Sequence, residues 1–312
     1  MPSSNSHSGK PVIVLCAGIA VQDILFRVEA FPPPGGKVMT DQFMIVSGGC
    51  AVNAAIAVAR LGGSARYTGP LGDENDAVSS QLVAAMNGEG VGTAGVLRIA
   101  GAAAPVSGIM IDAAGERVIA TYRDRRIEAA LPSDADAPLA DVTLLLADNR
   151  FPGFVQPICE AARRRGIPVV LDADRPTIED DPLFGIPTHV VFSSECLRET
   201  TGEADLSKAL LRMAPRTKAF LAVSDGPNPV RYIAEGTLRT LPVFRVDAID
   251  TLTAGDVFHA GFALALAEGR DEIAALRFGA AAAGLKCTRF GGSMGAPPRA
   301  EVEALLKRLA VE

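Results

Sequence analysis

Short apolar runs rich in β-branched residues recur along most of this chain, and they constrain its fold more than any other feature. Between most of these runs lie amphipathic segments that end in glycine, such as residues 153–166. Strands alternating with helices predict a doubly wound α/β fold, with a mostly parallel sheet covered by helices on both faces. The predicted buried strands are residues 12–19, 142–147, 168–171, 189–193 and 219–223. After residue 244 helices are predicted at 253–267, 271–288 and 299–310.

Two segments, at about 24–47 and 106–122, interrupt this rhythm. They alternate like exposed antiparallel strands, and we expect them to form a small β-sheet lid beside the main body. One apolar face of such a sheet needs a cover, which a substrate or a second subunit would supply. We therefore expect a homodimer through the lid. The predicted organisation is a disordered leader at 1–10 and one domain at 11–312.

Charge and cysteine usage exclude several classes of function. The chain has 30 Lys and Arg against 36 Asp and Glu, and its one basic run, 163–165, precedes Gly166, where cations favour a helix end. Nucleic acid is therefore not an expected partner. No apolar run is long enough for a bilayer, so no membrane partner is expected. Five scattered cysteines without a CxxC pair argue against a disulfide framework or a zinc site and predict a reducing, cytoplasmic location.

The segment DTLTAGD, residues 250–256, leads into an apolar helix. Ala254, Gly255 and Asp256 should occupy the first turn, where backbone amides are unpaired and bind anions. An acid in the same turn is unusual in an anion site. The structural alternative is that Asp256 only favours the helix dipole and that Asp250 only ends a strand.

A second segment, GGCAVNAAIAVARLGG, spans residues 48–63. Gly48 and Gly49 allow the backbone to approach a ligand closely. Asn53 lies about one turn into the following helix and offers a donor and an acceptor to a polyol. The alternative is a helix of small residues that packs tightly on the sheet.

Together the two segments resemble the paired motifs of the PfkB, or ribokinase-like, carbohydrate kinases: GG...N...A..LG near the N-terminus and DTxxAGD near the C-terminus. The turn SDGP at 224–227 and the segment at 280–292 extend the resemblance over nearly the whole chain. The nearest likeness is to the ketohexokinase and sulfofructose kinase branch, through AGIAVQD at 17–23, LLLADNR at 144–150 and LKCTRFGG at 285–292. This resemblance implies ATP-dependent phosphorylation of a sugar hydroxyl.

The resemblance also implies roles for the motif residues. Asp256 would be the general base, and the amides of its helix turn would stabilise the transferring phosphoryl group. Asp23 and Asn53 would bind sugar hydroxyls, and Gly48 and Gly49 would close over the sugar. For Asp23, the alternative is a strand-end residue that caps a turn.

For the nucleotide, Ser224 and Gly226 match the start of the family's loop beneath the ATP phosphates, although Pro229 stands where a later Gly is often found. Small side chains at helical spacing would leave room for adenine, or would simply pack against another helix. These residues are Ala280, Ala283 and Gly284.

Metal ions are expected with ATP, because Mg²⁺ neutralises its β- and γ-phosphates. The family often carries an NxxE motif for magnesium-bound water, but the Asn is missing from FSSECLRETTG at 192–202. Glu195 is the nearest candidate, and it is equally compatible with a helix-dipole role. Asp250 and nearby carbonyl groups are a candidate site for K⁺, as in some relatives.

Lys37 and Arg150 are the candidates for substrate choice, since two cations facing one pocket indicate an anionic substituent. In sulfofructose kinases a Lys and an Arg at similar positions meet the sulfonate, but Arg150 also has a counterpart in ketohexokinases. Thr121 stands where that branch uses Asn, and Lys37 would also suit an edge strand that is protected from aggregation. The predicted acceptor is therefore a ketose or a sulfonated or acidic sugar.

Two rival functions stay open at this stage. A nucleoside kinase would need an aromatic clamp, but the chain has no Trp and only Tyr67, Tyr122 and Tyr232. A non-catalytic sugar sensor would be favoured by loss of the base, which is present. His189 and His259 lie in apolar surroundings and are predicted to be packing residues.

Overall fold

The computed structural model describes residues 11–309, and the predicted leader at 1–10 lies outside them. Within the described residues a nine-stranded sheet has the order β13-β12-β11-β10-β9-β8-β1-β4-β5. Neighbours from β11 to β5 run parallel, whereas β12 and β13 add an antiparallel hairpin at one edge. The strands are β1 (Ile13–Ala17), β4 (Ser64–Leu71), β5 (Gly92–Arg98), β8 (Leu144–Asp148), β9 (Val169–Ala173), β10 (His189–Ser193), β11 (Phe220–Asp225), β12 (Asn228–Ala234) and β13 (Thr237–Leu241).

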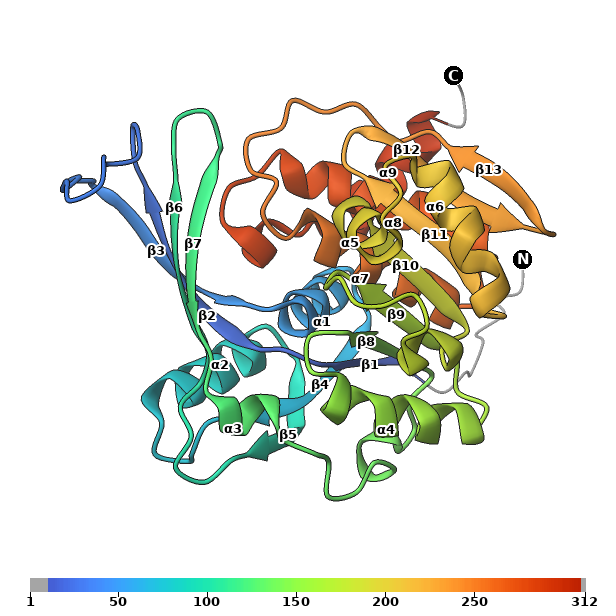
Figure 1. The fold of residues 1–312 in the computed structure, drawn as a ribbon, viewed down its shortest axis with the longest axis horizontal. Helices are drawn as coiled ribbons and strands as arrows, with labels where there is room; N and C mark the ends of the chain where they lie inside the picture. The colour runs from blue at the N-terminus through green and yellow to red at the C-terminus, as the bar shows by residue number, and fades with distance from the viewer. Residues whose placement is uncertain (1–10, 310–312) are drawn as a thin grey trace, which may run out of the picture.

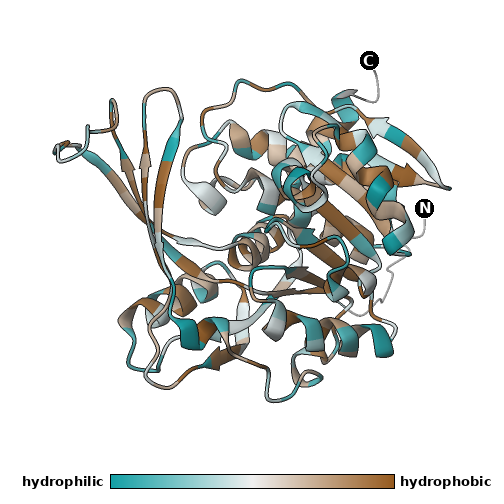
Figure 2. Ribbon diagram, viewed as in Figure 1, coloured by the Kyte–Doolittle hydropathy of each residue, from teal (hydrophilic) through white to brown (hydrophobic). Residues whose placement is uncertain are grey.

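The central strands are buried on both faces, which explains their continuous apolar runs. In β1, for example, Val14 and Cys16 face one hydrophobic core, whereas Ile13 and Leu15 face the other. Figure 2 shows hydrophobic residues along these strands. The predicted doubly wound α/β fold is therefore confirmed.

Helices cover both faces of the large sheet (Figure 1). One core lies beneath α1 (Cys50–Arg60), α2 (Ala77–Gly88), α7 (Ala254–Ala267), α8 (Glu272–Cys287) and α9 (Arg299–Leu309). The other lies beneath α4 (Pro152–Arg164), α5 (Ser194–Thr201) and α6 (Leu206–Met213). A short helix, α3 (Arg125–Glu128), follows the lid. No helix of the described residues is both long enough and apolar enough to cross a bilayer.

A separate four-stranded sheet, which we call the lid, stands beside the main body (Figure 1). Its order is β3-β2-β6-β7, formed by β2 (Val21–Arg27), β3 (Gln42–Gly48), β6 (Val106–Ile111) and β7 (Arg117–Tyr122). Both segments that were predicted to form the small sheet contribute to it. Because β3 leads through Gly49 directly into α1, the lid is joined to the residues of the candidate site.

Candidate active site

The first turn of α7 is the candidate anion-binding site. Thr253 precedes it in the left-handed conformation, with φ of 63°. Among the hydrogen bonds of the described residues, none uses the N–H groups of Gly255 or Asp256. Ala254 differs from the prediction, because its N–H donates to Thr251 O at 3.2 Å and is not free. The available donors are therefore the amides of Gly255 and Asp256, which suit an anion at the positive end of the helix.

Gly255 leaves space for such an anion. It is exposed, and a Cβ atom added to it would meet no atom within 4 Å. A phosphate group can therefore approach its amide without contacting a side chain.

Asn53 and Asp256 meet although they are 203 positions apart in the sequence. Asn53 Nδ2 donates to Asp256 Oδ2 at 2.7 Å, which fixes the carboxylate at the junction of α1 and α7. Asn53 is 3% exposed, and its Oδ1 atom has no hydrogen-bond partner in the protein. A buried acceptor without a donor costs free energy, so this atom is suited to accept a hydrogen bond from a hydroxyl group of a ligand.

The carboxylate of Asp256 is perturbed by its surroundings. Burial and, to a smaller extent, the negative charge of Asp172 raise the pKa of Asp256 to about 8, against the hydrogen bond from Asn53, which lowers it. The ligand atoms of Cys50, Asp172 and Asp256 lie within 4.8 Å of one another. A perturbed acid beside an anion-binding turn is characteristic of a catalytic base.

The buried ring of His259 contacts the first turn of α7. Its Nδ1 lies 2.8 Å from Gly255 O, and its Nε2 lies 3.2 Å from Val191 O and 3.4 Å from Asp172 Oδ1. All three partners of the ring are acceptors, so a proton on Nδ1 lets the ring donate to Gly255 O, and Nε2 then faces Val191 O and Asp172. Burial raises the pKa of Asp172, which the charge of His259 opposes. The ring is therefore a hydrogen-bonded packing residue that also holds Gly255.

Asp148, at the end of β8, organises the start of α1. Its carboxylate accepts hydrogen bonds from the amides of Ile19 at 2.8 Å, Arg150 at 2.9 Å and Ala51 at 3.2 Å. Burial raises the pKa of Asp148 to about 6 in spite of these bonds. The residue thereby fixes the loop after β1 to the helix that carries Asn53.

The glycine pair before α1 is required by close contacts. A Cβ atom on Gly48 would lie 2.0 Å from Asp23 Oδ2, and one on Gly49 would lie 2.5 Å from Ile19 O. Gly49 also has φ of 93°, a conformation that other residues rarely adopt. Asp23 is 7% exposed on β2, and burial raises the pKa of its carboxyl to about 6, against a hydrogen bond from Ser107. Gly48 thus leaves the space that the Asp23 carboxylate occupies.

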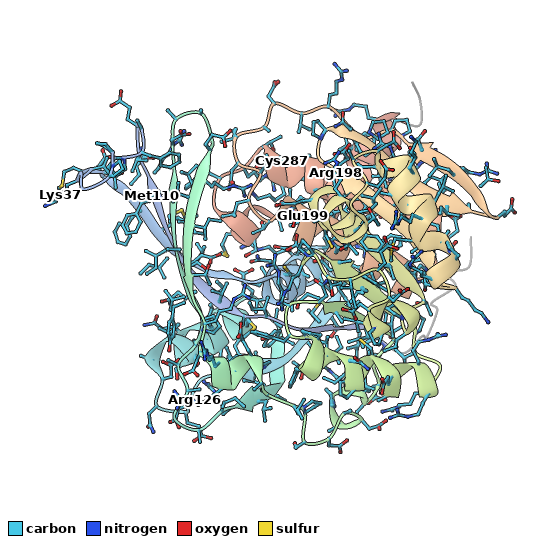
Figure 3. The ribbon with its side chains drawn as sticks, viewed as in Figure 1. Lys37, Met110, Arg126, Arg198, Glu199 and Cys287 are labelled. Atoms are coloured by element: carbon cyan, nitrogen blue, oxygen red, sulfur yellow. The ribbon has the colours of Figure 1, made fainter. Side chains whose placement is uncertain are left out.

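The predicted pairing of Lys37 with Arg150 is not formed. Lys37 is exposed at the outer end of the lid (Figure 3), because the long β2–β3 connection carries it away from the main body. Arg150 instead forms an ion pair with Asp174. Other arginines lie near Arg150: Arg175 Nη1 donates to Arg150 O at 3.3 Å, and burial together with the charges of Arg150 and Arg175 lowers the pKa of Arg123.

The predicted nucleotide residues lie on two elements. Ser224 is the penultimate residue of β11, where its hydroxyl donates to Phe192 O at 3.4 Å, and Gly226 forms the tight turn to β12 with φ of 54°. On α8, Ala280 is buried, whereas Ala283 and Gly284 are partly exposed. A Cβ atom on Gly284 would lie 3.7 Å from Val246, so this face of α8 packs on the segment before α7.

The two predicted metal ligands differ in their surroundings. Glu195 is exposed in the first turn of α5, where its carboxylate is free to reach a hydrated ion. Asp250 does not fit the predicted potassium site, because the ammonium group of Lys286 lies 3.0 Å from its Oδ2 atom. A second cation at this carboxylate would be repelled by the first.

Asp148, Asp172 and Lys286 are not singled out by the sequence patterns. The two aspartates have a signal that sequence reasoning can use: each lies at the carboxyl end of a predicted parallel strand, where polar side chains gather in open α/β sheets. Lys286 has none, since a lysine in the last turn of a helix is ordinarily a solvated residue that favours the helix dipole.

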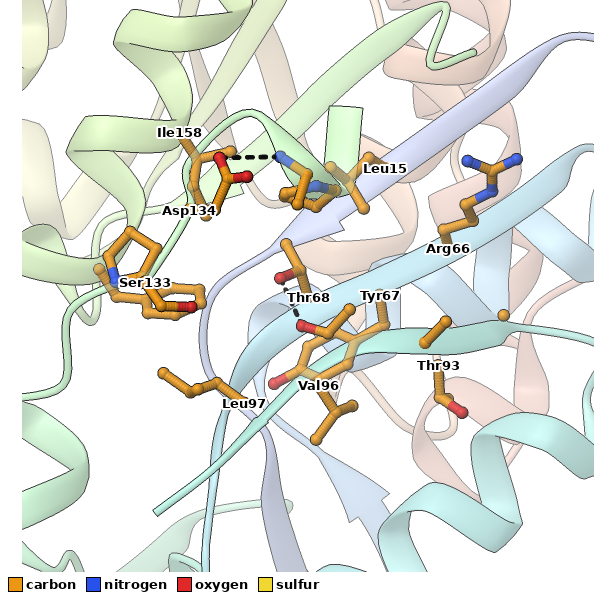
Figure 4. Close-up of a pocket in the computed structure, with 17 residues that line it drawn as sticks. Leu15, Arg66, Tyr67, Thr68, Thr93, Val96, Leu97, Ser133, Asp134 and Ile158 are labelled. Carbon is orange, nitrogen blue, oxygen red and sulfur yellow. Dashed lines mark hydrogen bonds between the residues drawn. The ribbon is translucent and has the colours of Figure 1, made fainter. Parts of the chain in front are cut away.

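A separate cavity of about 420 Å³ lies at the β5 edge of the large sheet (Figure 4). It is bounded by β4, β5, α4 and residues 132–138, with Thr68 Oγ1 donating to Gly95 O at 2.7 Å in its wall. None of the predicted site residues lines it. We therefore assign it no part in the active site.

Comparisons with known proteins agree with this geometry. The family model "pfkB family carbohydrate kinase" matches residues 13–299. A ribokinase of Bacillus subtilis is 30% identical over 292 residues, which cover 93% of this chain and 97% of that protein. A probable fructokinase of Arabidopsis thaliana is 25% identical, covering 90% and 94% of the two chains.

Solved structures give the same result. A putative ribokinase from Agrobacterium tumefaciens superposes with a TM-score of 0.91 at 34% identity, covering 97% of this chain and all of that one. The ribokinase of Arabidopsis thaliana, complexed with ribose and ATP, has a TM-score of 0.81 at 25% identity, with 95% and 99% covered. The ketohexokinase and sulfofructose kinase branch is not distinguished by these matches. The chain belongs to the pfkB family of carbohydrate kinases and is an ATP-dependent sugar kinase.

Proposed function

We propose that this kinase phosphorylates a hydroxyl group of a ketose or of a sulfonated or acidic sugar, with Asp256 as the general base. The observation that carries the proposal is the Asp256 carboxylate, held by Asn53 in a helix turn whose amides are unused. Phosphoryl transfer needs a positioned base and donors for the equatorial oxygens, and this turn supplies both.

The reaction proceeds by in-line displacement. The acceptor oxygen forms a bond to the γ-phosphorus, the bond from that phosphorus to the β–γ bridging oxygen breaks, and ADP leaves. The hydroxyl proton moves to Asp256, while the amides of Gly255 and Asp256 stabilise the charge on the transferring group. A pKa near 8 makes Asp256 a stronger base than an exposed carboxylate.

The proposed sugar contacts are the buried acceptor groups around the glycine pair. Asp23 accepts hydroxyl hydrogens from one side, and the orphaned Oδ1 of Asn53 accepts from another. We assign Gly48 and Gly49 to the wall of the sugar site, where Gly48 also leaves the space that the Asp23 carboxylate occupies. Buried acceptors of this kind discriminate strongly against deoxy analogues, which would leave them unpaired.

An acidic substituent is supported by the arginines near Arg150. Asp174 forms an ion pair with Arg150, whereas among the described residues the one ion-pair partner of Arg123 is Glu128, at 3.9 Å. The pKa of Arg123 is lowered by burial and by the charge of Arg150, so an anion placed between the two would relieve their repulsion. A carboxylate or sulfonate on the sugar would fit this site.

For the nucleotide, we assign the phosphates to the β11–β12 turn at Ser224 and Gly226, and the adenine ring to the small-residue face of α8. Its members are Ala280, Ala283 and Gly284. Mg²⁺ would accompany ATP and neutralise its phosphates, with Glu195 bound through water.

Two further assignments complete the proposal. The lid exposes large apolar side chains, including Phe43, Ile45 and Tyr122 at 63%, 55% and 55% exposure, which support a homodimer through this sheet. A mass in solution scattering that stays monomeric at every concentration would exclude the dimer.

The five cysteines are free thiols, which supports a cytoplasmic location.

The nucleoside kinase alternative is not better supported. Tyr67 is fully buried and donates to Gly18 O at 3.0 Å, and Tyr232 is 7% exposed within the core. Neither ring can clamp a base. The sensor alternative would require loss of the base, which Asp256 retains.

The test is ATP turnover by the purified protein with Mg²⁺ on fructose, 6-deoxy-6-sulfofructose, ribose, 2-keto-3-deoxygluconate and adenosine, beside the Asp256→Asn variant. We expect one ketose or acidic sugar to be preferred and its turnover to be lost in the variant. Preference for ribose or adenosine would contradict the proposed substrate class, and unchanged turnover by Asp256→Asn would contradict the assigned base.

A further inference from the structure

Lys286 is a fully buried lysine whose ammonium group contacts Asp250, in the segment that leads into the first turn of α7. It belongs to the last turn of α8, and its side chain is 0% exposed. Its Nζ donates to Asp250 O at 2.8 Å and lies 3.0 Å from Oδ2 of the same residue. A buried ammonium group is stable only when it is paired, so this interaction with Asp250 is specific.

Asp250 in turn connects two loops of the active site. Its Oδ1 accepts from the amide of Leu252 at 2.8 Å, at the start of the turn that leads into α7. Its Oδ2 accepts from the amides of Gly291 at 3.1 Å and Gly292 at 3.3 Å, in the loop after α8. The ammonium group of Lys286 therefore sits at the point where these two loops meet.

The ionised state of the pair is supported by its contacts. Burial alone would raise the pKa of Asp250, but the Leu252 amide and the charge of Lys286 hold it below its ordinary value. Burial lowers the pKa of Lys286, and the Asp250 carboxylate opposes this shift. Each partner thus stabilises the charged form of the other.

The turn that depends on this pair is strained. Thr253 adopts φ of 63°, a conformation that costs free energy in a residue other than glycine. A Cβ atom on Gly292 would lie 3.7 Å from Thr253 Cγ2, so the loop after α8 packs against this residue. Thr253 is followed directly by the turn that carries Gly255 and Asp256, so the position of those amides depends on its conformation.

We infer that Lys286 is a built-in cation that takes the place of the monovalent ion expected at Asp250. Its ammonium group supplies a compact positive charge at the carbonyl and carboxylate oxygens of Asp250, where such an ion would bind. Lys286 is thus a positioning residue for the turn at 250–256, and the kinase works without added potassium.

The test compares the wild type, Lys286→Met and the exposed-lysine control Lys218→Met in equal concentrations of potassium chloride and tetramethylammonium chloride. Thermal unfolding and the kcat/KM for the best acceptor are measured in each salt. Methionine keeps most of the volume of lysine but removes its charge. The unfolding measurement needs no acceptor, so it tests this inference even if the proposed sugar class is wrong.

For the wild type and Lys218→Met we expect the same Tm in both salts and a kcat/KM that differs by less than about twofold. For Lys286→Met we expect a kcat/KM at least about tenfold lower without potassium. Potassium chloride should partly restore kcat/KM and Tm, because a cation that binds only the folded state stabilises it.

Three results would overturn the inference. The first is a wild-type Tm or kcat/KM that rises strongly with potassium, which decides the question even if Lys286→Met does not fold. The second is a Lys286→Met variant with unchanged kcat/KM in tetramethylammonium chloride. The third is a folded, impaired variant that no monovalent cation improves.

Discussion

The space that Gly48 leaves for Asp23 gives a direct test of the proposed sugar site. In Gly48→Ala the new Cβ atom would lie 2.0 Å from Asp23 Oδ2 and 2.5 Å from Asp23 Cγ. Non-bonded heavy atoms approach to about 3.5 Å, so the carboxylate oxygen must move by about 1.5 Å. Asp23 is held by its buried position and by Ser107, and it cannot move this far without leaving its position in the proposed sugar site.

A displacement of this size at a substrate-positioning group costs about a hundredfold in kcat/KM. We expect that loss for the acceptor in steady-state kinetics, with the KM for ATP little changed. The matched control is Gly108→Ala on β6 of the lid, where an added Cβ meets no atom within 4 Å. A Gly48→Ala enzyme with wild-type kcat/KM, or an equal loss in Gly108→Ala, would refute the steric argument.

Four further outcomes are expected. Asp256→Asn should lower kcat by about 10²- to 10⁴-fold with an unchanged Tm; a smaller loss would point to another base. Asp256 must be ionised to accept a proton and its pKa is raised to about 8, so kcat/KM should rise with pH through that region. In Asn53→Ala the hydrogen bond that lowers this pKa is gone, so the midpoint should move to higher pH; a midpoint shifted downward would contradict the assignment. Arg150→Gln should raise the KM for an acidic acceptor about tenfold and spare a neutral one, whereas the exposed Arg125→Gln should change neither; equal effects on both acceptors would make Arg150 a purely structural residue.

Local patterns were sufficient for much of this protein. The strand and helix alternation predicted the large sheet, because side chains buried on both faces must be apolar along the whole strand. The strands β4, β5, β12 and β13 were not predicted, since they lie toward the sheet edges and are only partly buried or carry charged residues. The first turn of α7 was predicted because its residues are consecutive in the sequence. The hydrogen bond from the Ala254 amide to Thr251 O was not predicted, because it depends on the conformation of the preceding turn.

Contacts between distant segments were decided only by the tertiary structure. Asn53 and Asp256 meet across 203 positions, and Lys286 reaches Asp250 across 36, because strand order and helix packing bring their elements together. Lys37 was predicted to face the same pocket as Arg150. In the structure the lid instead places Lys37 at its outer end, away from Arg150. The sequence by itself determined which residue types stand at each strand end and helix start. Which of them share a site depends on long-range packing, and no local periodicity encodes it.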